Sequence, residues 1–483
     1  MKRSEMLKSV ADTPEWDLII IGGGATGLWC ALDGASRGYK TLLLEKGDFV
    51  EGTSSRSTKL FHGGLRYLKQ GRLGLIHEGL IERGYLAKNA PHLFTSRPFF
   101  LPFYSALDKP YYKLGMLLYD FLAGKLVLQK HRLLNRADSI AECPTLRSEG
   151  LKGGAVYYDG QFDDARFAIE LAKTAANYGA TLLNYCKVEE LVKTSGKVSG
   201  VIATELDTNT PFNIRGKVII NATGIFSDEL RKLDDRATPP IMVLSRGSHI
   251  IVDKKFLSSQ TALIVPKTGD KRVIFVIPWQ EKVLIGTTEA VVCEPSNNPK
   301  PSEEEISFLL EHAKLILTPY PKKEDILSSF AGIRPLVKSS HNKSSSKLSR
   351  NHEILISESG LVTIVGGKWT TGRKMAEDTL NRAFKKLLPC KTLPCKTKSL
   401  PLHKSPSFFS LPEIVHLAVE EEMALTAADI LARRTRTLFL DIKQALALAP
   451  EVIRLMAPLL KKNSLWEAEE LDKFNEYAKS YCV

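Results

Sequence analysis

The sequence predicts an α/β fold: a Rossmann-like dinucleotide-binding domain, an antiparallel β-rich domain and a small C-terminal helical domain. An apolar run that stops at a glycine cluster, between Trp16 and Gly27, predicts the first domain. A β-rich middle without a second dinucleotide fingerprint predicts the second, and a helical pattern from about residue 400 predicts the third. At 483 residues the chain is too long for one hydrophobic core, so two or three domains are expected.

The apolar run is typical of a buried parallel strand, and the following helix is expected from about Ala25 to Arg37. Gly22, Gly24 and Gly27 occupy the glycine positions of G-x-G-x-x-G. Glycine at these positions permits a tight turn, close approach of a pyrophosphate, and close packing of helix on strand. The helix N-terminus adds free N–H groups and a positive dipole, so this turn predicts a phosphate site.

A second strand is expected from Thr41 to Leu44 and ends at Glu45, about 20 residues after the glycine turn. A carboxylate at this point can accept hydrogen bonds from both ribose hydroxyls of a dinucleotide. The glycine triplet alone would also suit a simple turn before a helix. Strand, triplet, helix, strand and acid in this order favour the dinucleotide site.

A polar loop runs from Gly47 to Leu68 and is rich in hydroxyls and glycines. These residues leave many donors available to a planar polar ligand, so the loop is a candidate clamp for the cofactor. A flexible surface loop is the alternative interpretation.

Further along the chain the pattern predicts a helix at 164–179 and a hairpin of strands 187–193 and 198–206. A buried strand at 217–221 leads into Ala222-Thr223-Gly224, a second close approach of the backbone to the cofactor. Strands at 248–252, 272–278 and 283–286 suit an antiparallel sheet over the substrate. A strand at 361–365, Gly366-Gly367 and a helix from about Gly372 repeat the strand, turn and helix order, and helices at 412–423 and 427–434 begin the C-terminal domain.

The stretch from Tyr111 to Arg132 combines an apolar helical stripe with aromatic and basic residues. The stripe contains Leu114, Leu117, Leu118, Phe121 and Leu122, and its flanks carry Lys113, Lys125 and Lys130. The helix faces either the core or a membrane surface, and the pattern favours neither.

The composition excludes some classes of function but does not identify one. The formal charge of +13 suits an anionic substrate, an anionic membrane surface or a nucleic acid. No zinc-finger or RNA-recognition pattern is present, so no nucleic-acid partner is expected. Cys390 and Cys395 lack a second pair, so no metal site is predicted. No run of 18 apolar residues predicts a transmembrane helix.

Several motifs resemble one family. Residues 52–68, Gly-Thr-Ser-Ser-Arg-Ser-Thr-Lys-Leu-Phe-His-Gly-Gly-Leu-Arg-Tyr-Leu, are similar to the cofactor and substrate loop of the FAD-dependent glycerol-3-phosphate dehydrogenases. The likeness continues through residues 157–166, 220–224, 286–288, 332–335 and 366–371. It spans residues from about 15 to 445.

The resemblance implies one extended FAD in a discontinuous domain of residues 14–100, 151–235 and 355–388. The substrate domain would comprise 101–150 and 236–354, and the helical domain 400–483. The implied FAD contacts are Gly22, Gly24, Ala25, Thr26, Gly27, Glu45, Lys46, Thr53, Ser54, Ser55, Thr58, His62, Gly63, Gly64, Val188, Ala222, Thr223, Gly224, Gly367, Lys368 and Thr370.

The resemblance also implies a cation cluster for a phosphate monoester, because arginine grips phosphate oxygens in pairs. The implied substrate contacts are Arg66, Tyr67, Thr287, Arg334, Arg350 and Lys368, with His249, Arg334 and Lys368 as the catalytic group. Oxidising a secondary alcohol with flavin needs a base for the hydroxyl proton. His249 is the favoured base by resemblance, and His62 is its competitor.

The implied reaction is oxidation of sn-glycerol 3-phosphate to dihydroxyacetone phosphate, with electrons passed to a membrane quinone. An oxidase that uses oxygen, and an amine or amino-acid oxidase on the same fold, are the alternatives. The enzyme is expected to lie peripherally on the cytoplasmic side of a membrane, with an organellar membrane left open. A homodimer is one option for its assembly.

Overall fold

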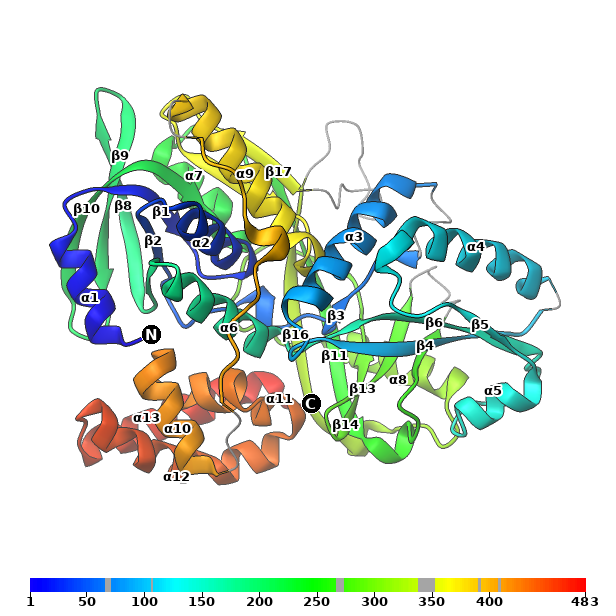
Figure 1. Cartoon of the computed structure of the whole chain (residues 1–483). Coiled ribbons are helices and arrows are strands. Elements are labelled where there is room, and N and C mark those ends of the chain that lie inside the picture. Colours follow the sequence, from blue (N-terminus) through cyan, green and yellow to red (C-terminus); the bar gives the residue numbers. More distant parts are fainter. Residues whose placement is uncertain (66–70, 106, 266–272, 338–351, 390–391, 407–409) are drawn as a thin grey trace.

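The computed structural model describes residues 1–65, 71–105, 107–265, 273–337, 352–389, 392–406 and 410–483. Two β-sheets with their covering helices lie beside each other, and a helical domain lies against both halves (Figure 1). The cofactor-binding α/β domain, the β-rich domain and the helical domain agree with the predicted fold class.

The first sheet is mostly parallel. Its strands run in the order β17 (His352–Ile356), β18 (Val362–Gly366), β10 (Thr210–Asn221), β1 (Trp16–Ile21), β2 (Thr41–Leu44) and β7 (Thr181–Leu183). Only β17 is antiparallel to its neighbour along this order of described strands. The hairpin β8 (Cys186–Thr194) and β9 (Lys197–Glu205) extends from the first half of β10.

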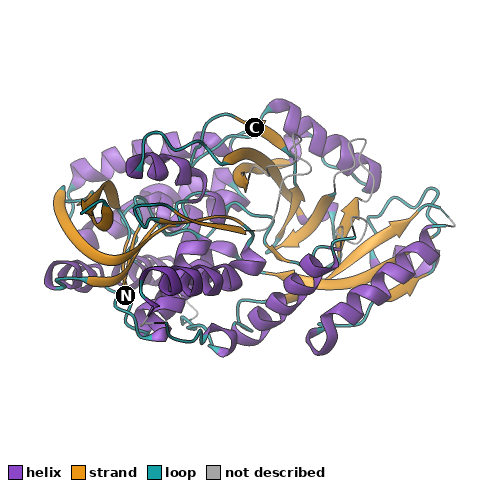
Figure 2. Cartoon of the chain, turned by 90° about the horizontal axis from the view of Figure 1, so that it is seen from above, coloured by secondary structure: helices purple, strands orange, loops and turns teal. Residues whose placement is uncertain are grey.

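Helices cover this sheet because its strands carry apolar residues on both faces. One face packs against α2 (Ala25–Arg37), α6 (Asp164–Asn177) and α9 (Gly372–Leu387). Figure 2 shows helices lying alongside the strands in the view from above. Helix α2 has the predicted bounds and ends where Gly38 adopts φ +102°. The other face packs against α1 (Arg3–Asp12), the β8–β9 hairpin and α7 (Ser227–Asp234).

The second sheet is antiparallel except where β12 meets β4. Its order is β15 (Ala290–Val292), β11 (Met242–Asp253), β14 (Lys282–Gly286), β13 (Ile274–Trp279), β12 (Ala262–Val265), β4 (Thr95–Phe103), β6 (Gly153–Gln161) and β3 (Leu60–Phe61). In addition β16 (Ile326–Val337) pairs with β11, and β5 (Arg132–Leu134) pairs with β6. Strands β3 and β6 thus belong to this sheet, although they fall within the segments assigned above to the FAD domain. The domain boundaries themselves stay a prediction.

The helices of this half are α3 (Leu73–Asn89), α4 (Asp108–Ala123), α5 (Arg136–Glu142) and α8 (Glu303–Ile316). Helix α4 lies at the outer edge of the molecule, on the right in Figure 1. It buries Met116, Tyr119 and Ala123, whereas Leu114 and Phe121 are 72% and 80% exposed. The predicted apolar stripe is therefore divided between a core-facing side and an exposed side.

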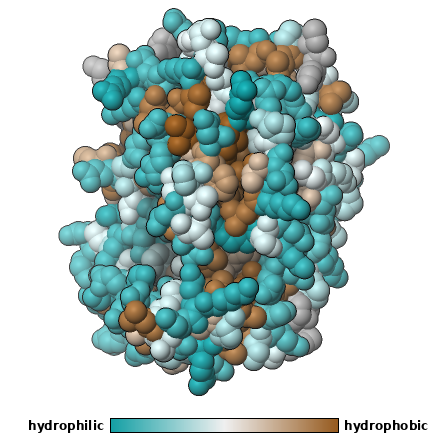
Figure 3. All heavy atoms as spheres, turned by 90° about the vertical axis from the view of Figure 1, so that its left-hand side faces the viewer, coloured by the Kyte–Doolittle hydropathy of each residue, from teal (hydrophilic) through white to brown (hydrophobic). Residues whose placement is uncertain are grey.

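The opposite end of the molecule carries α1, β8 and β9, and its surface is largely hydrophilic around a few central apolar side chains (Figure 3). No helix within the described ranges is long and apolar enough to cross a membrane.

The C-terminal domain contains α10 (Leu411–Glu422), α11 (Thr437–Leu440), α12 (Ile442–Leu460) and α13 (Ser464–Ala478). The helix expected at 427–434 is a π-helix over Asp429–Arg434, in which the Ile430 carbonyl accepts from Thr435 N–H. This domain packs on β16 through aromatic contacts. Phe439 lies between Phe330 of β16 and Tyr481, with ring centroids 4.8 and 5.0 Å away.

Candidate active site

A cavity of about 1450 Å³ is lined by residues of both sheets. Pockets for ordinary small ligands measure about 300–1,000 Å³. The larger volume of this cavity therefore suits an extended cofactor together with a substrate.

The glycine turn after β1 forms one wall of the cavity. A Cβ on Gly22 would lie 2.6 Å from the Ala222 carbonyl oxygen, and one on Gly27 would lie 1.8 Å from the Gly22 oxygen. Gly22 also adopts φ +110°, which side chains avoid. Because no Cβ fits, Gly24, Ala25 and Thr26 can present the N-terminus of α2 to the cavity. This turn fits a pyrophosphate.

Glu45 lies at the end of β2 and lines the cavity, together with Lys46 and Val188. Its carboxylate accepts hydrogen bonds from Gly23 N–H at 2.6 Å and Gly47 N–H at 2.9 Å. Burial raises the pKa of this carboxyl despite the two bonds. From this place in the cavity lining, the carboxylate could also accept from ribose hydroxyls, and this role stays a prediction.

The polar loop is folded against the turn rather than free. Thr53, Ser54 and Thr58 line the cavity, and the Ser54 hydroxyl accepts from Ala25 N–H at 3.0 Å. The Thr53 hydroxyl donates to the Ile333 carbonyl at 2.6 Å. Ser55 differs from its predicted role, because its side chain is buried outside the cavity lining and lies 3.5 Å from the Gly52 carbonyl.

Beyond β3, His62 and Gly64 line the cavity, and Gly63 lies behind them. Gly63 N–H lies 3.1 Å from the Tyr119 hydroxyl and 3.3 Å from the Asp159 carboxylate. Asp159 itself lines the cavity, and Arg83 donates to it at 2.6 Å. The sequence analysis assigned no role to Asp159, although it belongs to the family-like stretch 157–166.

The opposite wall comes from the ends of β10 and β18. It contains Ala222, Thr223, Gly224, Gly367, Lys368 and Thr370. The Thr223 hydroxyl donates to Asn221 Oδ1 at 2.7 Å, and His62 N–H donates to the Thr370 hydroxyl at 3.2 Å. Gly367 adopts φ +74°, and a Cβ there would lie 2.2 Å from Met375 Sδ. Two glycine-bearing turns thus bracket the cavity.

His249 lines the cavity from β11 and is only 1% exposed. Its Nε2 lies 3.0 Å from the Thr58 hydroxyl, and its ring stacks on Phe330 at 4.8 Å between centroids. Nδ1 meets no hydrogen-bond partner among the described residues. Burial first, then the charges of Arg334 and Lys59, lower the pKa of His249 well below its usual value. The imidazole is therefore neutral near pH 7, as a proton acceptor must be.

Arg334 of β16 lines the same part of the cavity as Thr287. Its Nη2 donates to the Thr287 hydroxyl at 2.9 Å, and its Nη1 donates to the Thr288 carbonyl at 3.4 Å. A Cβ on Gly247 would lie 2.3 Å from Nη2, so the missing side chain leaves room for the guanidinium. The structure therefore brings His249, Arg334, Thr287 and Lys368 to one cavity, as the sequence predicts.

Arg66, Tyr67 and Arg350, which the resemblance places around the substrate, lie outside the described residues. Among the residues that are described, no group of histidine, cysteine, aspartate and glutamate could hold a metal ion.

Comparison with known proteins gives consistent matches. A family described as FAD dependent oxidoreductase matches residues 17–373, and the C-terminal domain of alpha-glycerophosphate oxidase matches residues 391–470. The mitochondrial glycerol-3-phosphate dehydrogenase of Rattus norvegicus is 36% identical, over 97% of this chain and 74% of that protein. A probable mitochondrial glycerol-3-phosphate dehydrogenase of Dictyostelium discoideum is 39% identical, over 96% and 84%. The X-ray structure of the glycerol-3-phosphate dehydrogenase from Bacillus halodurans complexed with FAD has a TM-score of 0.82 at 29% identity, over 100% of this chain and 98% of that one.

Proposed function

The chain belongs to the family of FAD-dependent glycerol-3-phosphate dehydrogenases, and we propose that His249, Arg334 and Lys368 form its catalytic group. It oxidises sn-glycerol 3-phosphate to dihydroxyacetone phosphate with FAD as the cofactor. One observation carries the assignment of the catalytic group. A buried, neutral imidazole and an arginine share one cavity with glycine turns that fit a dinucleotide.

In the proposed reaction the substrate hydroxyl gives its proton to His249. FAD, held by the glycine turns and Glu45, would supply the acceptor for the hydride from the carbon that carries this hydroxyl. The neutral imidazole is available as the acceptor because burial and the neighbouring cations disfavour its charged form. A positioned base of this kind contributes roughly 10²- to 10⁴-fold to the rate.

Arg334 and Lys368 would hold the phosphate of the substrate. The contact with Thr287 fixes one side of the Arg334 guanidinium, which limits how the phosphate can approach. Arg334, whose charge acts on His249, would favour a phosphorylated alcohol over glycerol. An amine or amino-acid oxidase would instead need a single arginine for a carboxylate.

We assign the electrons to a membrane quinone, with oxygen as the alternative acceptor. Apolar residues at one end of the cavity support this choice; they include Phe99, Leu101, Phe275, Met116 and Leu118. The last two belong to α4, so the apolar end of the cavity lies beneath this helix.

The exposed side of α4 supports peripheral contact with a membrane surface. It presents Tyr111, Leu114, Leu117 and Phe121 to solvent, next to the exposed cations Lys113, Lys125 and Lys130. Apolar side chains can enter the lipid interface while the cations meet anionic head groups. Relatives named as mitochondrial support an organellar membrane, and the cytoplasmic side of a membrane stays the other option.

The reaction is tested by anaerobic reduction of the purified yellow protein with a panel of alcohols, phosphate esters and amines. Glycerol 3-phosphate should bleach the flavin, whereas glycerol and amines should not. Bleaching by an amine but not by glycerol 3-phosphate would overturn the assignment. Oxygen uptake with and without added quinone separates the two acceptors.

A further inference from the structure

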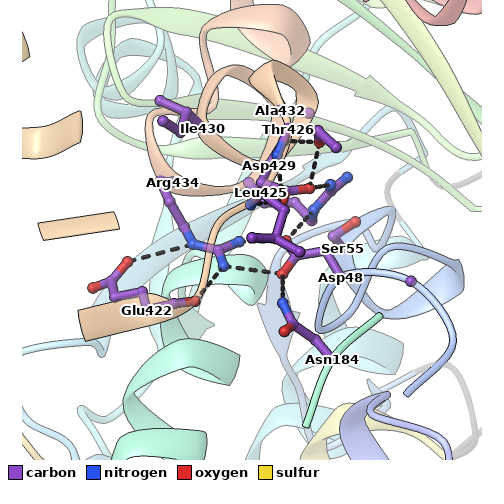
Figure 4. Close-up of polar contacts among 12 residues, drawn as sticks. Asp48, Ser55, Asn184, Glu422, Leu425, Thr426, Asp429, Ile430, Ala432 and Arg434 are labelled. Carbon is purple, nitrogen blue, oxygen red and sulfur yellow. Dashed lines mark hydrogen bonds and ion pairs between the residues drawn. The ribbon is translucent and has the colours of Figure 1, made fainter. Parts of the chain in front are cut away.

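A buried ion cluster joins the C-terminal domain to the loop that follows β2. Asp48 is fully buried, and its carboxylate accepts from Arg433 Nε at 2.6 Å and from Arg434 Nη2 at 3.0 Å. A further bond comes from Arg434 Nη1. Asn184 Nδ2 bridges Asp48 Oδ1 at 3.2 Å and the Met423 carbonyl at 2.8 Å. Figure 4 shows Arg434 and Asn184 pointing toward Asp48.

The arginines are themselves held from the C-terminal side. Arg434 donates to the Glu422 carbonyl at 2.8 Å (Figure 4), and Arg433 pairs with Asp429. The Tyr185 hydroxyl donates to the same Asp429 at 2.7 Å. Although burial opposes it, Arg434 and Arg433 keep the pKa of Asp48 below its usual value. The carboxylate of Asp48 is therefore charged, and its hydrogen-bond partners come from both the C-terminal domain and the first half of the chain.

A second contact, at Ser55, ties the same loop to the C-terminal domain seven residues after Asp48. Arg436 Nη2 donates to the Ser55 carbonyl at 2.8 Å and to Asp164 Oδ1 at 3.1 Å. Lys59 Nζ donates to the same carbonyl and to Asp164, both at 2.7 Å. The backbone of the loop is thus fixed on its outer side at two places.

The inner side of this loop faces the cofactor cavity. Glu45, Glu51, Thr53 and Ser54 line it, whereas none of the described residues beyond Thr370 does so. The C-terminal domain can therefore influence the bound cofactor through this loop, besides its contact with β16. Its strongest contact with the loop is at Asp48, three residues after Glu45.

A buried ionic cluster is stable in few arrangements. Removing the partner of a buried charge costs several times more free energy than removing the partner of an exposed charge. In the observed position of the loop, Asp48 accepts hydrogen bonds from Arg433, Arg434 and Asn184 together. That position is also the one in which Glu45 and Ser54 meet the glycine turn.

We propose that Arg433 and Arg434 are positioning residues for FAD, which hold the cofactor loop through Asp48 and so make the C-terminal domain set the affinity for FAD. The inference rests on FAD binding and not on the identity of the base or the electron acceptor.

The test measures the Kd for FAD of the full-length apoprotein, by quenching of flavin fluorescence, for Arg434→Gln. Loss of a charged hydrogen bond at such a site should raise Kd roughly ten- to a hundredfold. Flavin reduction by glycerol 3-phosphate at saturating FAD should keep its normal rate. Arg434→Lys keeps the charge but loses the planar fork, so its Kd should lie between those of Arg434→Gln and the unaltered protein.

Lys462→Gln is the matched control. Lys462 also joins the C-terminal domain to the first half of the chain, through Asp207 at 2.8 Å. Asp207 lies in the β9–β10 turn, and the side chains of Lys462 and Asp207 are 30% and 37% exposed. Its Kd for FAD should change by less than about twofold.

Urea unfolding of each apoprotein distinguishes positioning from plain stability. If Arg434→Gln and Arg434→Lys lower the free energy of unfolding but leave the Kd for FAD unchanged, the cluster is a structural joint only and the proposal is wrong. If Arg434→Gln does not fold, an unchanged Kd in Arg434→Lys alone overturns it.

Discussion

Replacing Arg334 by glutamine tests the anion site most specifically. Arg334 lies in the cavity with its Nη2 2.9 Å from the Thr287 hydroxyl and near His249. Glutamine keeps a hydrogen-bonding side chain but removes the charge and the planar fork. A lost charged hydrogen bond is worth about 1.5–3 kcal/mol, which corresponds to a rise in KM for glycerol 3-phosphate of roughly ten- to 150-fold.

The same change should alter the pH dependence. After burial itself, the charge of Arg334 is the largest influence that lowers the pKa of His249. Without that charge the pKa rises, so the imidazole becomes protonated at a higher pH. A base works only when neutral, and the acid limb of kcat/KM should therefore move to higher pH in Arg334→Gln.

Steady-state kinetics with an artificial electron acceptor, over a range of pH, measures both effects. FAD content should stay normal, because Glu45, Ser54 and the glycine turn are unchanged. Arg97→Gln is the control, since Arg97 lies in the same sheet, bonds Gln161 at 2.8 Å and does not line the cavity. An unchanged KM together with an unchanged acid limb would refute both the phosphate contact and the electrostatic argument.

Three further changes test other parts of the account. Glu45→Ala should release FAD on dialysis, because the ribose acceptor is lost, and full flavin retention would contradict this role. Burial raises the pKa of Glu470 from 4.5 to about 7, so the folded state binds its proton more tightly and stability should fall as pH rises between these values. Glu470→Gln removes this dependence. The Tm of Glu470→Gln minus that of the unaltered protein should therefore be larger at pH 8 than at pH 5, and an equal difference at both pH values would contradict the raised pKa of Glu470. Glutamate at Lys113, Lys125 and Lys130 should weaken salt-sensitive co-sedimentation with anionic vesicles but leave flavin reduction unchanged, and unaltered sedimentation would move the membrane contact away from α4.

Local patterns predicted the centre of the fold well. Strand β2 has its predicted bounds of Thr41 to Leu44, as α2 does, because apolar runs and glycine turns act over a few neighbouring residues. His249, Arg334 and Thr287, which the family-like motifs single out, line one cavity, and their catalytic roles stay a prediction. His249 lies within β11, Arg334 lies within β16, and Thr287 directly follows β14.

Local sequence patterns could not predict which strands pair, or which side chains meet, when the partners are far apart in the sequence. Nothing local in β3 or β6 shows which sheet it joins, because the choice depends on partners far along the chain. Asp48 and Arg434 are 386 residues apart, and Thr58 and His249 are 191 apart. A charged residue in a turn is usually solvated, so neither member of the first pair signals burial by itself.

The most direct measurement is the rate of flavin reduction by glycerol 3-phosphate, under anaerobic conditions, in the unaltered protein, His249→Asn and His62→Asn. With His249 as the base, His249→Asn should keep FAD and lose roughly 10²- to 10⁴-fold in rate, while His62→Asn loses much less. A normal rate in His249→Asn, with the loss found in His62→Asn instead, would contradict the central claim.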